Sequence, residues 1–244
     1  MNTTDISEEL TVGAIVAKDI RNAEVFKKHG IDFCCGGKQT LKQACADAGI
    51  REQQILDELK QSEFQSAVPS MNFNSWSLDF LTTYIINTHH AFVKSNIVLI
   101  HEIAEKVSLR HGETHPETIE LAAVFNELAN EMTHHMMKEE QILFPYINDL
   151  ASLQKDHKQL AQSRFGSIQN PIRMMENEHE MAGNHLETIS KLTNNFNPPA
   201  DACTSFCLLY NKFKEFDGDL HQHVHLENNI LFPKALELEQ QLLG

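Results

Sequence analysis

Four long stretches of the chain repeat hydrophobic and polar residues with the period of an α-helix. They span residues 76–110, 116–149, 171–196 and 201–240, and their hydrophobic side chains recur at steps of three and four. This spacing places the hydrophobic side chains along one face of a helix. We therefore expect an all-α protein in which four amphipathic helices pack together, because no stretch has the alternating pattern of a β-strand.

A smaller helical region precedes these stretches. Residues 8–64 contain three short helical patterns, with Gly30 and Gly49 as expected helix ends. Thr40 is an expected N-cap, because its hydroxyl can accept a hydrogen bond from the first turn of the helix that follows. This region therefore predicts a small helical module.

The two regions are joined by a segment without periodicity. Residues 67–75, AVPSMNFNS, contain one proline, two serines and two asparagines, a composition typical of a linker. We therefore expect a module at residues 1–66, a linker at 67–75 and a main domain at 76–244.

The hydrophobic faces of the four long helices carry polar exceptions. The second face follows Leu121, Phe125, Leu128, Met132, His135, Glu139, Ile142 and Tyr146. The fourth follows Phe206, Leu209, Phe213, Phe216, Leu220, His223, Glu227 and Ile230. The first carries His89 among Leu78, Leu81, Ile85 and Phe92, and the third carries His179 among Ile172, Met175, Ala182, Leu186 and Ile189. Four histidines and two glutamates are thus expected to point inward.

The main domain is an internal repeat. HMMKEEQILFP at 135–145 matches HVHLENNILFP at 223–233, with an offset of 88 residues, and His89 and His179 are 90 residues apart. Each half therefore supplies one helix with a histidine and one helix with a His-x-x-x-Glu motif. Two such helix pairs predict a four-helix bundle with twofold pseudosymmetry.

These six residues predict a metal centre. Burying several imidazoles and two carboxylates would cost many kcal/mol unless a metal ion pairs with them. Residues four apart on a helix point the same way, so His135 with Glu139 and His223 with Glu227 each form an arm with two ligands. Four histidines and two glutamates exceed the needs of one tetrahedral zinc ion. We therefore expect two iron ions bridged by Glu139 and Glu227, with an oxo or hydroxo bridge, in a haemerythrin-like bundle; manganese is a weaker alternative.

The remaining histidines lack this geometry. His134 pairs four residues on with Lys138 rather than with a glutamate, and His221 and His225 share a face with charged residues that we expect to be solvated. The others are interpreted as surface or ordinary structural residues: His90, His101, His111, His115, His157 and His185.

Two adjacent cysteines stand out in the module. Cys34 and Cys35 lie in the sequence FCCGG, just after a predicted helix end. Two interpretations stay open: exposed, reactive thiols, or small buried residues in a tight turn. Cys45 is expected to be structural, and Cys203 and Cys207 are expected to serve packing rather than metal binding.

Composition argues against a nucleic-acid-binding, membrane or secreted protein. The 20 Lys and Arg against 34 Asp and Glu give a formal charge of −14, which disfavours nucleic acid as a partner. No hydrophobic run approaches the roughly 20 residues that a membrane span needs, so we expect no membrane association. The first residues, MNTTDISEEL, lack the features of a secretory signal. Together with five cysteines, an odd number, they predict a cytoplasmic protein.

Three segments carry a resemblance to a known family. DFCCGGKQTL at 32–41, HHMMKEEQILFP at 134–145 and HLENNILFP at 225–233 resemble the Repair of Iron Centres family. The resemblance implies a di-iron protein of the bacterial cytoplasm that helps to restore iron-sulfur clusters damaged by nitric oxide or peroxide. It implies His89, His135, His179 and His223 as terminal ligands and Glu139 and Glu227 as bridges. It also implies a redox or iron-transfer role for Cys34 and Cys35.

Three functions are compatible with these residues. The first is a stress-response factor that repairs iron-sulfur clusters by donating iron, with damaged iron-sulfur proteins as its partners. The second is an enzyme that reduces nitric oxide at the same two irons. The third is a protein that binds or senses oxygen or nitric oxide, with the module relaying the signal. A homodimer is a further possibility that the sequence does not decide.

Overall fold

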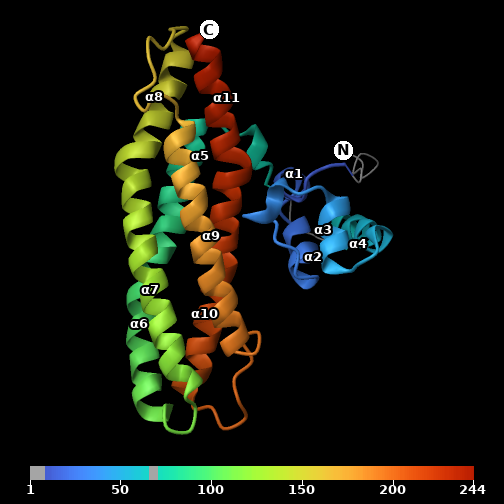
Figure 1. Ribbon diagram of the computed structural model, residues 1–244, viewed down its shortest axis with the longest axis vertical. Coiled ribbons are helices and arrows are strands. Elements are labelled where there is room, and N and C mark those ends of the chain that lie inside the picture. Colours follow the sequence, from blue (N-terminus) through green and yellow to red (C-terminus); the bar gives the residue numbers. More distant parts are fainter. Residues whose placement is uncertain (1–8, 66–70) are drawn as a thin grey trace.

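A computed structural model of the protein describes residues 9–65 and 71–244. Figure 1 shows an elongated helical bundle, with a small helical module packed against one side of it. Within the described ranges the regular elements are helical, and the single β-bridge joins Thr11 to Thr40. The prediction of an all-α fold with a module before a bundle is confirmed.

The module contains more helices than the sequence pattern suggested. Instead of three α-helices, residues 9–65 form four, together with one short 3-10 turn: α1 Val12–Lys18, α2 Asn22–Lys28, η2 Gly36–Lys38, α3 Leu41–Ala48 and α4 Glu52–Gln65. Thr40 caps α3 as predicted, in a capping box with Gln43. Gly30 and Gly49 follow α2 and α3 with φ of 67° and 68°, a left-handed conformation that favours glycine.

The bundle is built from four helical segments that run alternately up and down. The first comprises α5 Leu78–Ile85, η4 Ile86–His90 and α6 Ala91–His111, and the second comprises α7 Glu117–Lys138, η5 Glu139–Leu143 and α8 Phe144–Lys155. The third is α9 Gln169–Leu192, and the fourth comprises α10 Thr204–Leu226, η6 Glu227–Leu231 and α11 Phe232–Leu243. In Figure 1, α6 lies beside α7 and α10, and α7 lies beside α9.

Three of the four segments contain a π-helical turn: η4, η5 and η6. A π turn adds a residue to the helical repeat, so the buried face shifts by one position. This shift corrects one prediction: Ile142 is 46% exposed, whereas its neighbour Leu143 is 2% exposed. Pro145 and Pro233 follow η5 and η6, and a proline ring displaces the carbonyl four residues earlier, which favours a wider turn there.

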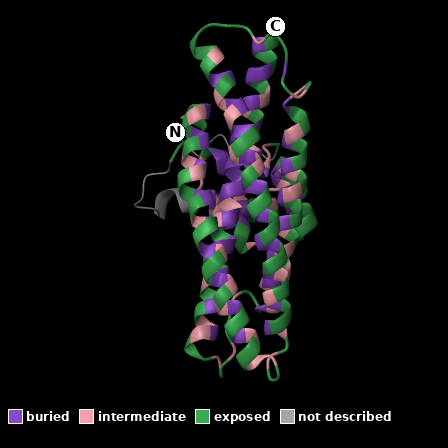
Figure 2. Ribbon diagram, turned by 90° about the vertical axis from the view of Figure 1, so that its left-hand side faces the viewer, coloured by how far each residue is buried: buried purple, intermediate pink, exposed green. Residues whose placement is uncertain are grey.

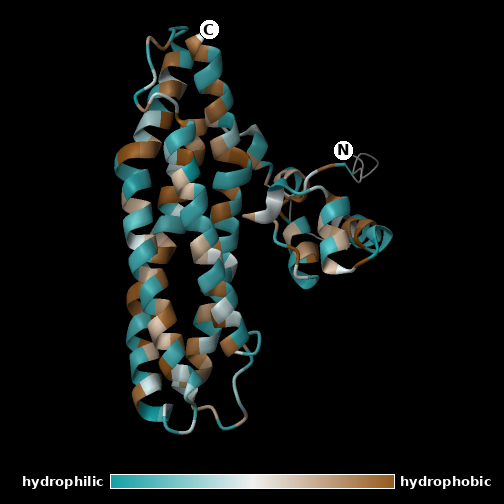
Figure 3. Ribbon diagram, viewed as in Figure 1, coloured by the Kyte–Doolittle hydropathy of each residue, from teal (hydrophilic) through white to brown (hydrophobic). Residues whose placement is uncertain are grey.

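The interior of the bundle consists of two hydrophobic clusters. Figure 2 shows buried residues in the interior of the bundle, and Figure 3 shows hydrophobic and hydrophilic positions alternating along its helices. Phe125 and Phe213 belong to one cluster, and Phe144 and Phe232 belong to the other. On α9, His179 lies between the two clusters, so the polar residues occupy the middle of the bundle.

The module and the end of the predicted linker are both packed against the bundle. Phe26 of the module and Phe216 of the bundle belong to one continuous hydrophobic cluster. In the predicted linker, residues 67–70 lie outside the described ranges, but Phe73 is 1% exposed and its ring lies 4.7 Å from that of Trp76. The end of the linker is therefore part of the core. None of the described helices is both long and apolar enough to cross a lipid bilayer.

Candidate metal centre

Six polar residues meet in the middle of the bundle, and each is at most 1% exposed. The histidines lie in η4, α7, α9 and α10, and the glutamates begin η5 and η6. They are His90, His135, Glu139, His179, His223 and Glu227. Five of the six are residues that the helical pattern predicted.

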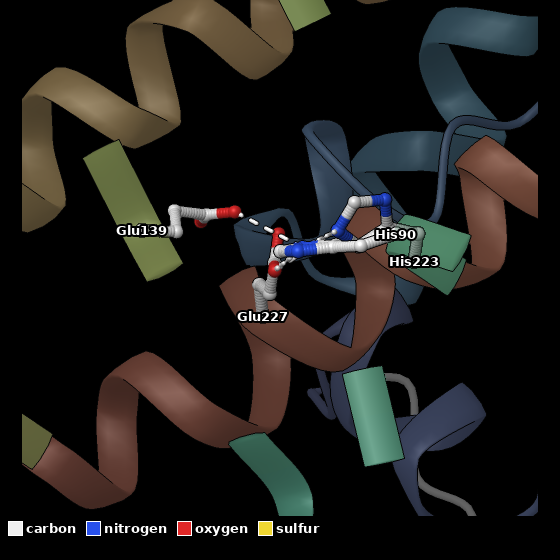
Figure 4. A group of neighbouring side chains, drawn as sticks. All are labelled: His90, Glu139, His223 and Glu227. Atoms are coloured by element: carbon white, nitrogen blue, oxygen red, sulfur yellow. Dashed lines mark hydrogen bonds and ion pairs between the residues drawn. The ribbon is translucent and has the colours of Figure 1, made fainter. Parts of the chain in front are cut away.

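His90 and His223 form one group with the two carboxylates (Figure 4). Nε2 of His90 lies 3.3 Å from Oε2 of Glu139 and 3.9 Å from Oε1 of Glu227. Nε2 of His223 lies 3.0 Å from Oε1 of Glu227, and the two imidazole nitrogens are 3.2 Å apart. Four potential ligand atoms therefore face one another.

His135 and His179 form a second group with the same two carboxylates. Nε2 of His135 lies 3.3 Å from Oε2 of Glu139, and Nε2 of His179 lies 3.1 Å from Oε2 of Glu227. In each group, the ligand atoms lie within 4.8 Å of one another. Because both glutamates are shared, the two groups are adjacent and resemble a site for two bridged metal ions.

The carboxylates lack the hydrogen bonds that their burial demands. Within the described residues, both oxygens of Glu139 and Oε2 of Glu227 have no hydrogen-bond partner with acceptable geometry. An uncompensated buried carboxylate costs several kcal/mol, whereas a cation between two carboxylates and four imidazoles removes that cost. The donor set of nitrogen and carboxylate oxygen suits iron.

The imidazoles and carboxylates of the two groups shift one another's pKa. Burial lowers the pKa of His90 and of His135, but the neighbouring carboxylates outweigh this effect and raise each pKa to about 10. Burial and the charge of Glu227 raise the pKa of Glu139, but His135 and His90 outweigh them and lower it to about 2. Without a metal ion, protons on His90 and His135 therefore balance the carboxylates.

Comparison with known proteins supports the site. A family model described as "Hemerythrin HHE cation binding domain" matches residues 81–235, and one described as a domain of unknown function (DUF542) matches residues 8–63. The iron-sulfur cluster repair protein YtfE of Musicola paradisiaca is 37% identical over 233 residues, which cover 95% of this chain and 98% of the relative. This chain belongs to the iron-sulfur cluster repair family. The resemblance predicted from the sequence is confirmed.

Other relatives support the same family. The protein of the same name from Yersinia pestis (strain Pestoides F) is 37% identical over 232 residues, which cover 94% of this chain and 97% of the relative. A probable iron-sulfur cluster repair protein of Haemophilus influenzae is 36% identical over 216 residues, covering 87% of this chain and 90% of the relative. The similarity thus includes both the module and the bundle of this repair-family chain.

Three of the four imidazoles are oriented by an outer hydrogen bond. Nδ1 of His135 lies 2.9 Å from Glu178, which also pairs with Lys138, and Nδ1 of His90 lies 2.8 Å from Glu140, which also pairs with Lys94. Nδ1 of His179 lies 2.8 Å from Oδ1 of Asn228. Such contacts fix the orientation of the ring and increase its strength as a metal ligand.

His89 does not join the cluster in this repair-family chain. Its Nδ1 lies 2.9 Å from Asp219, its ring stacks 5.6 Å from that of His223, and Nε2 has no partner among the described residues. The structure instead places His90 against the carboxylates, because the π turn η4 rotates it to the inner face. The helical pattern assumed regular α-helical geometry and therefore predicted His89, and the ligand implied by the resemblance was placed on the same residue.

A second histidine also differs from expectation. His225 is 0% exposed rather than solvated, and its ring lies 5.7 Å from that of Phe33 in the module. Burial lowers the pKa of His225 to about 4. The face that includes His225 and Asp217 is covered by the module, a contact that the helical pattern of the bundle could not reveal.

The two cysteines lie at the junction of module and bundle. Cys34 is buried and Cys35 is half-buried, with their sulfur atoms 3.9 Å apart. Contact with Cys35 and burial raise the pKa of Cys34. Both cysteines line a cleft of about 990 Å³, whose wall includes Asn228, the residue that contacts His179. The thiols therefore share a cleft with the outer edge of the metal centre.

Proposed function

We propose that this protein binds two iron ions in the bundle and repairs damaged iron-sulfur clusters by donating iron. The sharing of Glu139 and Glu227 between two histidine pairs is the observation that carries this proposal. Two buried carboxylates without sufficient hydrogen bonds favour bound cations, and the family membership points to iron-sulfur clusters as the target.

The residues suggest how the ions would be held. One ion would bind between His90 and His223 and the other between His135 and His179, with Glu139 and Glu227 bridging them. This assignment keeps five of the six ligands that the sequence predicted and replaces His89 by His90. When bound, iron supplies both a transferable ion and a one-electron redox couple.

Donation requires a path out of the bundle. The cleft beside the metal centre is lined by Cys34 and Cys35, which fits a redox or iron-transfer role for these thiols. Their recipients would be iron-sulfur proteins whose clusters have been damaged by nitric oxide or by oxidants. Sulfur ligands bind iron well, so a thiol-lined cleft suits transfer to a cluster.

Repair of a damaged enzyme tests this function. An iron-sulfur enzyme inactivated with nitric oxide is incubated anaerobically with the iron-loaded protein, and the recovered activity is measured. We expect recovery with the wild type and with Glu127→Leu, whose position is exposed on α7 and lies outside the cysteine-lined cleft, but not with Glu139→Leu. Equal recovery with Glu139→Leu and wild type would contradict the proposal.

Reduction of nitric oxide is a second candidate function. The two adjacent groups would hold two ferrous ions side by side, so that two diatomic molecules could bind together. Conversion of two nitric oxide molecules to nitrous oxide and water consumes two electrons and two protons, and two ferrous ions supply the electrons. Nitrous oxide in the headspace in proportion to iron would favour this function; its absence during successful repair would favour donation.

A further inference from the structure

Three consecutive residues of η6 contact three different parts of the molecule. Glu227 lies in both ligand groups, Asn228 contacts His179, and Asn229 contacts the loop that carries Cys34. These three residues are consecutive in one π turn, so only a short stretch of backbone separates their side chains. The segment therefore joins the metal centre to the thiols.

Asn229 holds the thiol loop through its side-chain amide. Nδ2 donates hydrogen bonds to the carbonyl oxygens of Phe33, at 3.2 Å, and Cys34, at 3.1 Å. The amide occupies a slot between two glycines of the module. A Cβ atom at Gly13 would lie 2.1 Å from Oδ1 of Asn229, and one at Gly37 would lie 2.5 Å from it, so a side chain at either position would displace the Asn229 amide.

The arrangement exists in only one half of the internal repeat. Gln141 is the counterpart of Asn229 and Met137 is the counterpart of His225, and both are exposed to solvent. In the second half, His225 is buried and its Nδ1 lies 3.2 Å from Nδ2 of Asn229. The module therefore contacts the half of the repeat that contains Asn229. A substitution at Gln141 is a matched control for a substitution at Asn229.

We propose that Asn229 is a positioning residue that fixes the Cys34–Cys35 loop over the cleft when metal binds to Glu227 and His179. A bound ion would restrain the carboxylate of Glu227 and the ring of His179, and thereby the π turn from which Asn229 projects. The thiols would then be held in place in the loaded protein and released as the metal leaves. This inference rests on the proposed metal centre.

The reactivity of Cys35 tests the coupling. The full-length protein, metal-free or loaded anaerobically with Fe²⁺, is treated with iodoacetamide, and alkylation of each cysteine is followed by peptide mass spectrometry. The exposed Cys203 serves as an internal reference. We expect iron to slow alkylation of Cys35 relative to Cys203 by about fivefold or more, as is usual for coupling between two sites.

Variants separate this coupling from direct protection of the thiols by iron. In Asn229→Ala the effect of iron on Cys35 should disappear although both thiols and all six ligands remain, whereas Gln141→Ala should retain it. Gly37→Ala should also abolish it, because the added methyl group displaces Asn229 from the module side. Asn229→Asp, which keeps the shape but has no N–H donor, should behave like Asn229→Ala.

Iron content measured on the same samples distinguishes the two proposals. If the chain binds about two irons but the Cys35 rate is unchanged, or if Asn229→Ala keeps the full effect, the coupling is wrong and the metal centre stands. If the wild type binds no iron, the metal centre and the coupling are both contradicted.

Discussion

His90 lies in contact with Glu139, Nε2 to Oε2 3.3 Å, although His89 has the spacing that a regular helix would favour. The π turn that ends at His90 accounts for this contact. It contains one residue more than a regular helical turn, so the inward position that follows Ile85 is His90 rather than His89. The fourth imidazole of the metal centre is therefore assigned by backbone geometry rather than by helical periodicity.

Alanine substitution distinguishes the two adjacent histidines. His90→Ala should lower the iron content from about two ions to about one per chain, because it removes one of two imidazoles from a single group. His89→Ala should leave the content near two, because its ring contacts Asp219 and does not contact Glu139 or Glu227. Iron analysis of both purified variants decides this, and the reverse result would restore His89 as the ligand.

Iron binding should release protons. In the metal-free chain the pKa values of His90 and His135 are about 10, so both rings are positively charged imidazolium ions at neutral pH. Metal ions bind only the neutral imidazole, so loading at pH 7 should release about two protons from this pair. A pH indicator in weakly buffered anaerobic solution measures the release. Loading His90→Ala should release fewer protons, and an unchanged value would contradict the protonated state.

The same shifts predict the pH dependence of stability in the metal-free chain. Histidines whose folded pKa exceeds the unfolded value of about 6.5 contribute stability that is fully present below that value. This contribution is lost as the pH rises through about 10. The melting temperature of the metal-free protein should therefore fall between these pH values. Calorimetry at several pH values tests this, and a rising melting temperature would reverse the assigned charges.

The outer hydrogen bond to His135 should strengthen iron binding. Glu178→Gln keeps the size of the side chain but removes the carboxylate that orients Nδ1 of His135. Loss of such a contact commonly weakens metal affinity by about 10- to 100-fold. Competition with a ferrous chelator measures the change, with Glu127→Gln on the exposed face of α7 as the control. Equal affinities would show that Glu178 does not support the ligand.

The core of the bundle should depend on its aromatic residues. Phe125 is 0% exposed and its ring lies 5.5 Å from that of Phe213, so Phe125→Ala should lower the free energy of unfolding by about 3–5 kcal/mol. Leu109→Ala, at a position 88% exposed, should change it by less than about 0.5 kcal/mol. Urea unfolding of the metal-free variants provides the comparison. Similar losses in both would place Phe125 outside the core.

Helical periodicity predicted the bundle and five of the six clustered residues because most of each segment is regular. On α9, which has no π turn, every predicted inward residue is buried: Ile172, Met175, His179, Ala182, Leu186 and Ile189. A single extra residue in a turn is invisible to a pattern that assumes constant spacing. Pro145 and Pro233 are local signals for η5 and η6, but no proline marks η4.

Contacts between segments that are distant in the sequence could not be predicted either. His225 appeared to face solvent because Asp217 and Lys214 share its helix face, but the module covers His225 and Lys27 pairs with Asp217 at 2.7 Å. These contacts join residues about 190 positions apart, and periodicity within one helix carries no information about them. The sequence also did not predict that Gly13 and Gly37 leave room for the side chain of Asn229.

The metal content of two bridge variants tests the central claim most directly. Wild type, Glu139→Leu and Glu227→Leu are purified, loaded anaerobically with Fe²⁺ and analysed for iron, manganese and zinc. About two irons per wild-type chain, falling sharply in both variants while the helical content is retained, is the predicted result. A single zinc ion, or an iron content that neither substitution changes, would contradict the dinuclear centre.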